Sequence, residues 1–205
     1  MIRNDREYRN FSLLKRKQSE ESEPDYKVRG YASTFDPYLL WSDGQTEVYE
    51  KIDATAFDEA DMSDVIFLYN HEGMVYARQK NGTLQLSTDD HGLLAEADLS
   101  STQASREMYN AIQSGLVDQM SFAFTVEDEE FDRETNTRII HRIGKVYDVS
   151  AVSIPANPGT DIAAVSARSY FDGVVEAAKA ERLRREKAQA LETAFKEFME
   201  VINER

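Results

Sequence analysis

Three histidines occur in the 205 residues, and one of them stands where catalytic chemistry is expected. His71 follows the apolar run Val-Ile-Phe-Leu-Tyr at 65–69 and Asn70, which places it where a buried strand ends. The ends of strands are where a scaffold presents reactive groups. His91 lies in a polar turn and His141 inside a strand pattern, and neither position suggests catalysis. A hydrogen-bonded structural histidine is the alternative interpretation of His71.

Ser121 is the candidate nucleophile, and the reason is the pattern of side-chain sizes around it. In the segment Met-Ser-Phe-Ala-Phe-Thr-Val at 120–126, strand alternation directs the four large side chains to one face. The opposite face receives Ser121, Ala123 and Thr125. The large side chains are expected to hold the strand in the core, while the small ones leave room for a substrate backbone beside the hydroxyl. Ordinary packing is the alternative for a serine in a strand.

Asp148 interrupts the segment Val-Tyr-Asp-Val-Ser-Ala-Val-Ser-Ile at 146–154, which otherwise suits the interior of a sheet. A buried carboxylate without a partner is costly, so a partner is expected. An imidazole is one, because a carboxylate fixes the tautomer of the ring and stabilises the imidazolium formed when histidine takes a hydroxyl proton. Arg138, Arg142 or backbone amides are the alternative partners.

His71, Ser121 and Asp148 together predict a serine hydrolase with an unusual chain order. The order His, Ser, Asp differs from that of chymotrypsin, subtilisin and the α/β-hydrolases, and no Gly-x-Ser-x-Gly elbow surrounds any serine. The absence of cysteine excludes a cysteine nucleophile and thiolate metal sites. No second histidine lies at a helical or hairpin spacing from His71 to complete a zinc site, and we expect no cofactor.

The elements that must position these residues are mostly short strands separated by turn residues. Strand character is found at 11–14, 26–35, 48–52, 65–69, 83–87, 93–99, 119–126 and 137–154, the last with a break near Gly144. The acidic segment 127–134 is expected to be a solvated connection between the last two strands. This pattern predicts an α+β protein, a mainly antiparallel β-barrel or sandwich with one or more packing helices.

Two helices complete the expected architecture. The first is capped by Ser100 or Ser101 and ends at Gly115, with Ala104, Met108 and Ala111 at helical spacing. The second is a long helix in the C-terminal part of the chain, whose apolar face is marked by Leu191, Phe195, Phe198 and Ile202. The predicted organisation is an N-terminal tail at 1–10, one domain at 11–165 and a helical tail at 166–205.

Composition excludes several classes of function. The formal net charge of −14 opposes binding to a phosphate backbone, so no nucleic-acid partner is expected. No apolar stretch approaches the roughly 20 residues needed to cross a membrane, and the charged first ten residues do not resemble a signal peptide. We expect a soluble protein inside the cell where it is made.

Several ordered blocks of sequence resemble the prohead proteases of tailed bacteriophages, a family distantly similar to the herpesvirus assemblin proteases. The blocks are GYASTF at 30–35, AF at 56–57, LYNH at 68–71, GLLAEADL at 92–99, MSFAF at 120–124, and DVSAV at 148–152 followed by PANP at 155–158. By position, the resemblance implies that His71 is the base, Ser121 the nucleophile and Asp148 the third member. The family usually has glutamate at this last position, and aspartate shortens the side chain by one methylene.

The resemblance also implies a fold and a biological role. We expect an assemblin-like fold and a serine endopeptidase that acts in the host cytoplasm, within the assembling procapsid. Its expected substrates are the major capsid protein, scaffold segments and itself, and the C-terminal helix could form a homodimer. The turn at 155–160 is the candidate source of oxyanion donors. Two alternatives stay open: a non-enzymatic capsid scaffolding protein on the same fold, and a hydrolase of small esters with a deep apolar pocket.

Overall fold

The computed structural model describes residues 6–14, 25–153 and 175–193. These residues form ten strands, one 3-10 turn between β6 and β7 (η1, Gln79–Asn81) and the helix α1 between β8 and β9 (Gln103–Ser114). The strands are β1 (Glu7–Leu14), β2 (Lys27–Thr34), β3 (Tyr38–Ser42), β4 (Glu47–Ile52), β5 (Ile66–Tyr69), β6 (Glu72–Arg78), β7 (Leu84–Thr88), β8 (Gly92–Asp98), β9 (Gln119–Asp132) and β10 (Thr137–Val152). Residues 175–193 form a further helix.

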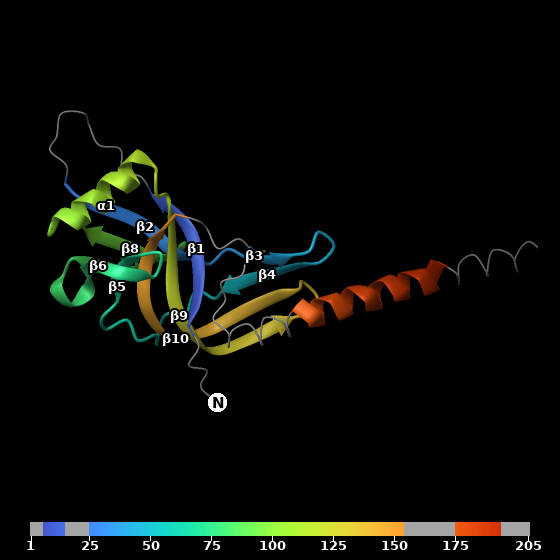
Figure 1. The fold of residues 1–205 in the computed structure, drawn as a ribbon. Helices are drawn as coiled ribbons and strands as arrows, with labels where there is room; N and C mark the ends of the chain where they lie inside the picture. Colours follow the sequence, from blue (N-terminus) through green and yellow to red (C-terminus); the bar gives the residue numbers. More distant parts are fainter. Residues whose placement is uncertain (1–5, 15–24, 154–174, 194–205) are drawn as a thin grey trace, which may run out of the picture.

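The sheet is organised around the long antiparallel hairpin of β9 and β10 (Figure 1). Its strand order is β3-β4-β10-β9-β1-β2-β8-β7, and β5 pairs with β10 and β6 outside this path. The first half of β10 pairs in parallel with β4, and its second half pairs in parallel with β5. The centre of the sheet therefore joins strands that are far apart in the sequence.

All eight predicted strands are present, with several differences. The strand β1 begins at Glu7 rather than at 11, so residues 7–10 of the predicted N-terminal tail belong to the sheet and pair with β9. The strand β9 continues through the acidic segment to Asp132, so this segment is not the connection that its charge suggested. The connecting turn is shorter and lies at 133–136. The strands β3 and β6 were not predicted; each pairs with a neighbour in a short hairpin, and such pairing forms strands that lack a strong alternating pattern. The predicted break near Gly144 is confirmed by a register shift between Ile143 and Lys145.

The predicted helix is confirmed, with a correction to its first residues. The N-cap is Thr102 rather than Ser100 or Ser101, and its hydroxyl accepts a hydrogen bond from the backbone N–H of Ser105 at 3.0 Å. Gly115 ends the helix in the left-handed conformation, as expected. The buried face of α1 consists of Ser105, Met108, Tyr109 and Ile112. Of the three positions used to predict the helix, Met108 is buried, whereas Ala104 and Ala111 are only partly buried.

The large side chains of the β9 segment lie in the main core, as their alternation predicted. Met120, Phe122, Phe124 and Val126 are all buried, and the rings of Phe122 and Phe124 stack with their centroids 4.3 Å apart. Because these side chains are fixed on one face of β9, Ser121 must point to the other. The core thus determines the direction of the candidate nucleophile.

The α+β class is confirmed, but a closed barrel is not found. Along the part of the chain that the structure describes, the pairings run from β3 to β7 and do not join these two end strands. The predicted assemblin-like closure therefore stays a prediction.

The predicted C-terminal helix is present at 175–193, and the rest of the 166–205 tail lies outside the described residues. Its first turn packs on the outer hairpins through Val175 and Ala178, which contact a second small core that includes Val48 and Trp41. Beyond this contact the helix projects away from the sheet (Figure 1), and Leu191 is 73% exposed. Of the helices in the described ranges, none has the length and apolarity needed to cross a membrane.

Candidate active site

His71 lies in the tight turn that joins β5 and β6. Tyr69 and Glu72 face each other across the hairpin, and both residues between them, Asn70 and His71, have positive φ values of 49° and 61°. Positive φ at both central residues is the requirement of a type I′ hairpin turn, in which glycine usually follows asparagine. A non-glycine residue in this region costs roughly 1 kcal/mol. The fold therefore holds His71 in a position that a glycine would occupy more easily.

Hydrogen bonds to the end of β10 hold this turn in place. The backbone N–H of Asn70 donates to the carbonyl of Ala151 at 3.0 Å. The N–H of Ser153 donates to the side-chain oxygen of Asn70 at 3.2 Å. The backbone N–H of His71 donates to Ser150 Oγ at 3.2 Å. These three contacts join residues near position 70 to residues near position 150, so the turn is fixed against β10.

Ser121 and Asp148 lie on the two strands of the central hairpin. Ser121 is paired with Asn10 of β1 on one side and with Ser150 of β10 on the other. Asp148 is paired with Ala123 of β9 and, through the parallel contact, with Ile66 of β5. The end of β5 therefore lies beside the C-terminal part of β10. The turn that follows β5 brings His71 next to Ser121 and Asp148.

The structure brings the three predicted residues together. His71 Nε2 lies 2.6 Å from Ser121 Oγ, and His71 Nδ1 lies 2.6 Å from Asp148 Oδ1. An acceptor-only carboxylate at Nδ1 requires the proton on that nitrogen, which leaves Nε2 as the acceptor of the serine proton. Asp148 is 3% exposed, and the alternative arginine partners bind elsewhere: Arg138 contacts other carboxylates, and Arg142 contacts Glu127. This geometry is that of a nucleophile, a base and a carboxylate that orients the base.

The surroundings of Ser121 are more enclosed than the small side chains suggested. Ser121 and Ala123 have no exposed surface, and Thr125 is 6% exposed. The side chain of His71 is 16% exposed, which makes the imidazole the most accessible of the three candidate catalytic groups. The expected open face beside the hydroxyl is therefore wrong for this conformation, because β1 and β10 flank Ser121 and the turn at His71 contacts it.

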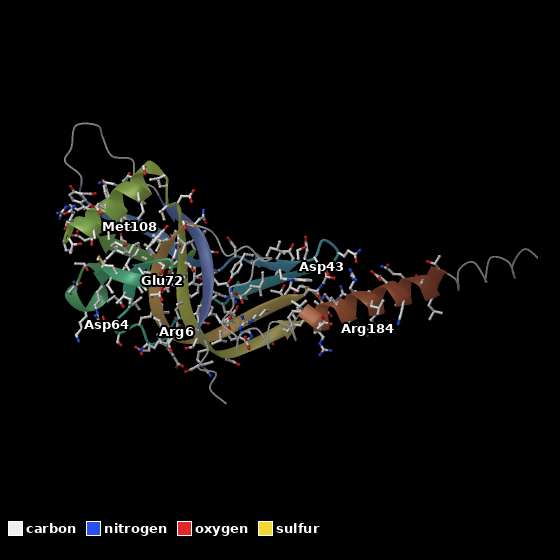
Figure 2. All side chains as sticks on the ribbon, in the orientation of Figure 1. Arg6, Asp43, Asp64, Glu72, Met108 and Arg184 are labelled. Carbon is white, nitrogen blue, oxygen red and sulfur yellow. The ribbon has the colours of Figure 1, made fainter. Side chains whose placement is uncertain are left out.

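Figure 2 gives the place of this turn in the whole molecule. Glu72, the residue after His71, lies in the same part of the protein as Met108 of α1, far from Arg184 of the C-terminal helix. The candidate site and the projecting helix thus occupy different ends of the structure.

The two other histidines have no such arrangement. His141 contacts the carboxylates of Asp53 and Glu130, and the hydrogen bond that its Nδ1–H donates to Asp53 raises the pKa of His141. His91 packs edge-on against the ring of Tyr31. Within the described ranges, no three histidine or acidic side chains form a cluster that could hold a metal ion. The candidate oxyanion turn at 155–160 lies outside the described residues.

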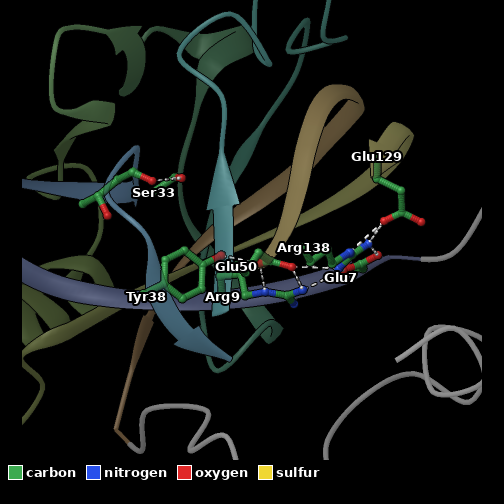
Figure 3. A network of polar contacts seen from close by, with 8 residues as sticks. Glu7, Arg9, Ser33, Tyr38, Glu50, Glu129 and Arg138 are labelled. Atoms are coloured by element: carbon green, nitrogen blue, oxygen red, sulfur yellow. Dashed lines mark hydrogen bonds and ion pairs between the residues drawn. The ribbon is translucent and has the colours of Figure 1, made fainter. Parts of the chain in front are cut away.

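A second feature of the sheet is a buried network of charged groups that connects β1, β4 and β10 (Figure 3). Arg138 of β10 donates to Glu7 of β1 at 2.7 Å and to Glu50 of β4 at 2.8 Å, and Arg9 donates to the same two carboxylates. Burial by itself raises the pKa of Glu7, but Arg138 and Arg9 outweigh it and lower this pKa to about 2. Tyr38 and Glu129 complete the network. The network ties β1 to β10 across β9, the strand that carries Ser121.

Sequence alternation could have revealed one more residue of the site. Ser150 follows Asp148 by two positions on the same strand, so both side chains point to the same face. Its hydroxyl donates to Asp148 Oδ1 at 2.7 Å. The period of two was present in the sequence, but the contact with His71 depends on the parallel pairing of β5 and β10.

Comparisons with known proteins give two matches. The family model of the caudovirus prohead serine proteases matches residues 12–172. Among solved structures, the capsid assembly protease gp21 of bacteriophage T4 is similar with a TM-score of 0.46 and 9% identity, over 74% of this chain and 98% of that chain. The comparison with curated proteins gives no match. The family match spans most of the chain and includes all three residues that meet at the site, and on this basis the chain belongs to the caudovirus prohead serine protease family.

Proposed function

We propose that this protein is a serine endopeptidase of phage head maturation, with Ser121 as nucleophile, His71 as general base and Asp148 as the residue that orients the base. Membership of the prohead serine protease family supports the reaction class and the biological setting. The single observation that carries the residue assignment is the continuous chain of contacts from Ser121 Oγ through the His71 ring to Asp148, with both distances at 2.6 Å.

The proposed reaction begins with proton transfer to His71 Nε2. Ser121 Oγ attacks the carbonyl carbon of the scissile peptide bond as its proton passes to the imidazole. Asp148 stabilises the imidazolium that results. His71 then returns the proton to the leaving amine, and an ester between Ser121 and the acyl part of the substrate remains. A water molecule, deprotonated by the same nitrogen, hydrolyses this ester and regenerates the hydroxyl.

The short side chain of Asp148 is compatible with this role. The family usually has a glutamate here, so an aspartate must approach the ring more closely. The parallel pairing of β10 with β5 places Asp148 opposite Ile66, and the carboxylate contacts the ring within hydrogen-bond distance. We therefore assign Asp148 the function that the longer residue has in the family.

The proposed substrates follow from the family rather than from the site. We propose that the enzyme cleaves scaffold segments and the major capsid protein within the procapsid, and also cleaves itself. We further propose 11–165 as the assemblin-like protease domain and 166–205 as a tail for assembly. The helix at 175–193 could provide a contact to a second copy, since it projects from the sheet and Leu191 is exposed.

The direct test compares the wild type with Ser121→Ala during co-expression with the cognate major capsid protein and scaffold. Intact-mass spectrometry of the products should show new N-termini with the wild type and none with the variant. Ser33→Ala is the matched control, because Ser33 is equally buried in a strand but contacts a backbone carbonyl of its own strand. If wild type and Ser121→Ala gave the same fragments, the endopeptidase proposal would fail and a scaffolding role would be favoured.

A further inference from the structure

The described hydrogen bonds of Ser150 connect two of the three proposed catalytic residues. Its Oγ lies 2.7 Å from Asp148 Oδ1 and 3.2 Å from the backbone nitrogen of His71. Ser150 has no exposed surface. We propose that Ser150 is a positioning residue, which holds the Asp148 carboxylate and the His71 turn in the relative positions that their contact requires. This inference rests on the proposed function of Ser121, His71 and Asp148.

The directions of these hydrogen bonds follow from the donors available. The backbone N–H of His71 can only donate, so Ser150 Oγ accepts from it. The single hydroxyl proton of Ser150 then goes to Asp148 Oδ1, which as a carboxylate can only accept. His71 Nδ1 also lies 3.2 Å from Ser150 Oγ, but its proton is directed to Asp148 at 2.6 Å. One hydroxyl thus fixes both the turn that carries the base and the acid that orients it.

Asp148 Oδ1 consequently receives two hydrogen bonds, one from the imidazole and one from Ser150. The second bond restricts rotation of the carboxylate, so that Oδ1 stays directed at His71 Nδ1. This restriction matters more for aspartate than for glutamate, because the shorter side chain has less freedom to compensate for a displaced ring.

The position of Ser150 in the sheet explains how one side chain reaches both partners. Its Cα is paired with Ser121 on β9 and with Leu68 on β5. The turn residue His71 is three positions after Leu68, and Asp148 is two positions before Ser150 on the same face. An alanine here would fit the strand equally well but would leave the N–H of His71 without this acceptor.

The test measures the rate at which a fluorophosphonate probe labels Ser121, because this reaction reports activation of the hydroxyl without a known cleavage site. We expect Ser150→Ala to label about 10- to 100-fold more slowly than the wild type, the usual range for a lost hydrogen bond to a charged group. Ser150→Thr, which keeps the hydroxyl, should recover most of the rate. Ser33→Ala is the control for removal of a buried serine hydroxyl. If Ser150→Ala does not fold, Ser150→Cys has nearly the same volume and only a weak donor, and replaces it.

A double-mutant cycle separates positioning from a general effect on stability. Because Ser150 acts in part through Asp148, Ser150→Ala should slow labelling clearly less in an Asp148→Ala background than in the wild type, and the remaining loss should come from the contact with the His71 turn. Equal losses in both backgrounds, or an unchanged rate for Ser150→Ala alone, would overturn the inference while the proposed function stands. Labelling of Ser121→Ala at the wild-type rate would instead refute the proposed function, and this inference with it.

Discussion

Replacing Asp148 by asparagine removes the charge beside the imidazole with little change in shape, and the structure gives the size of the effect. The distance of 2.6 Å between His71 Nδ1 and Asp148 Oδ1 places the centres of the two charges about 4 Å apart. At an effective dielectric constant of about 20, opposite charges at this separation attract by about 4 kcal/mol. This attraction exists only after His71 has taken the serine proton, so its loss should lower the rate about 1000-fold.

Labelling of Ser121 by the fluorophosphonate probe provides the assay, with fragment analysis by mass spectrometry as a second readout. Asp90→Asn is the matched control, since it makes the same change in charge at an exposed residue of a turn. Thermal unfolding should show that both variants are folded under the assay conditions. A labelling rate for Asp148→Asn within about threefold of the wild type would mean that the carboxylate does not support the base, and the reasoning from the His71 contact would be refuted.

Three further predictions concern residues outside the candidate site. Arg138 and Arg9 outweigh burial and lower the pKa of Glu7 to about 2 from the ordinary value of 4.5, so protonation of Glu7 should cost the wild type about 3 kcal/mol of stability as the pH falls through this interval. Glu7→Gln should therefore flatten the pH dependence in urea titrations, and parallel curves would contradict this. Gly92→Ala should destabilise by about 3 kcal/mol, measured by thermal unfolding, because the new Cβ would lie 2.0 Å from the backbone oxygen of Ser33; an unchanged melting temperature would contradict the close approach of β2 and β8. Thr102→Ala should cost about 1 kcal/mol through loss of the helix cap without slowing the labelling of Ser121, and a slower rate would link α1 to catalysis.

Some features of the site were predictable because they depend on short stretches of sequence. The alternation in β9 separates Ser121 from the phenylalanines, and burial of those rings determines on which face the serine lies. A carboxylate inside an apolar strand requires a partner, and Asp148 has one in His71. Sequence patterns of this kind report local geometry and the cost of burial, both of which act within a few residues of the position concerned.

Other features depended on pairings that no local pattern encodes. The acidic charge of 127–134 suggested a solvated connection, yet β9 extends to Asp132 because β10 pairs with it along its length. The strands β3 and β6 exist through their hairpin partners. The buried network of Glu7, Arg9, Glu50 and Arg138 combines residues from three strands, β1, β4 and β10, and no local pattern shows that these charges are partners.

The types of the three central residues, and the faces on which two of them lie, were thus determined by the sequence itself. Their meeting was decided by the tertiary structure: His71 and Asp148 are separated by 77 positions, and they come into contact because β5 pairs in parallel with the second half of β10. The same register brings Ser150 between them. Register between distant strands is set by the packing of the whole sheet, and for this reason it could not be derived from any one segment of the chain.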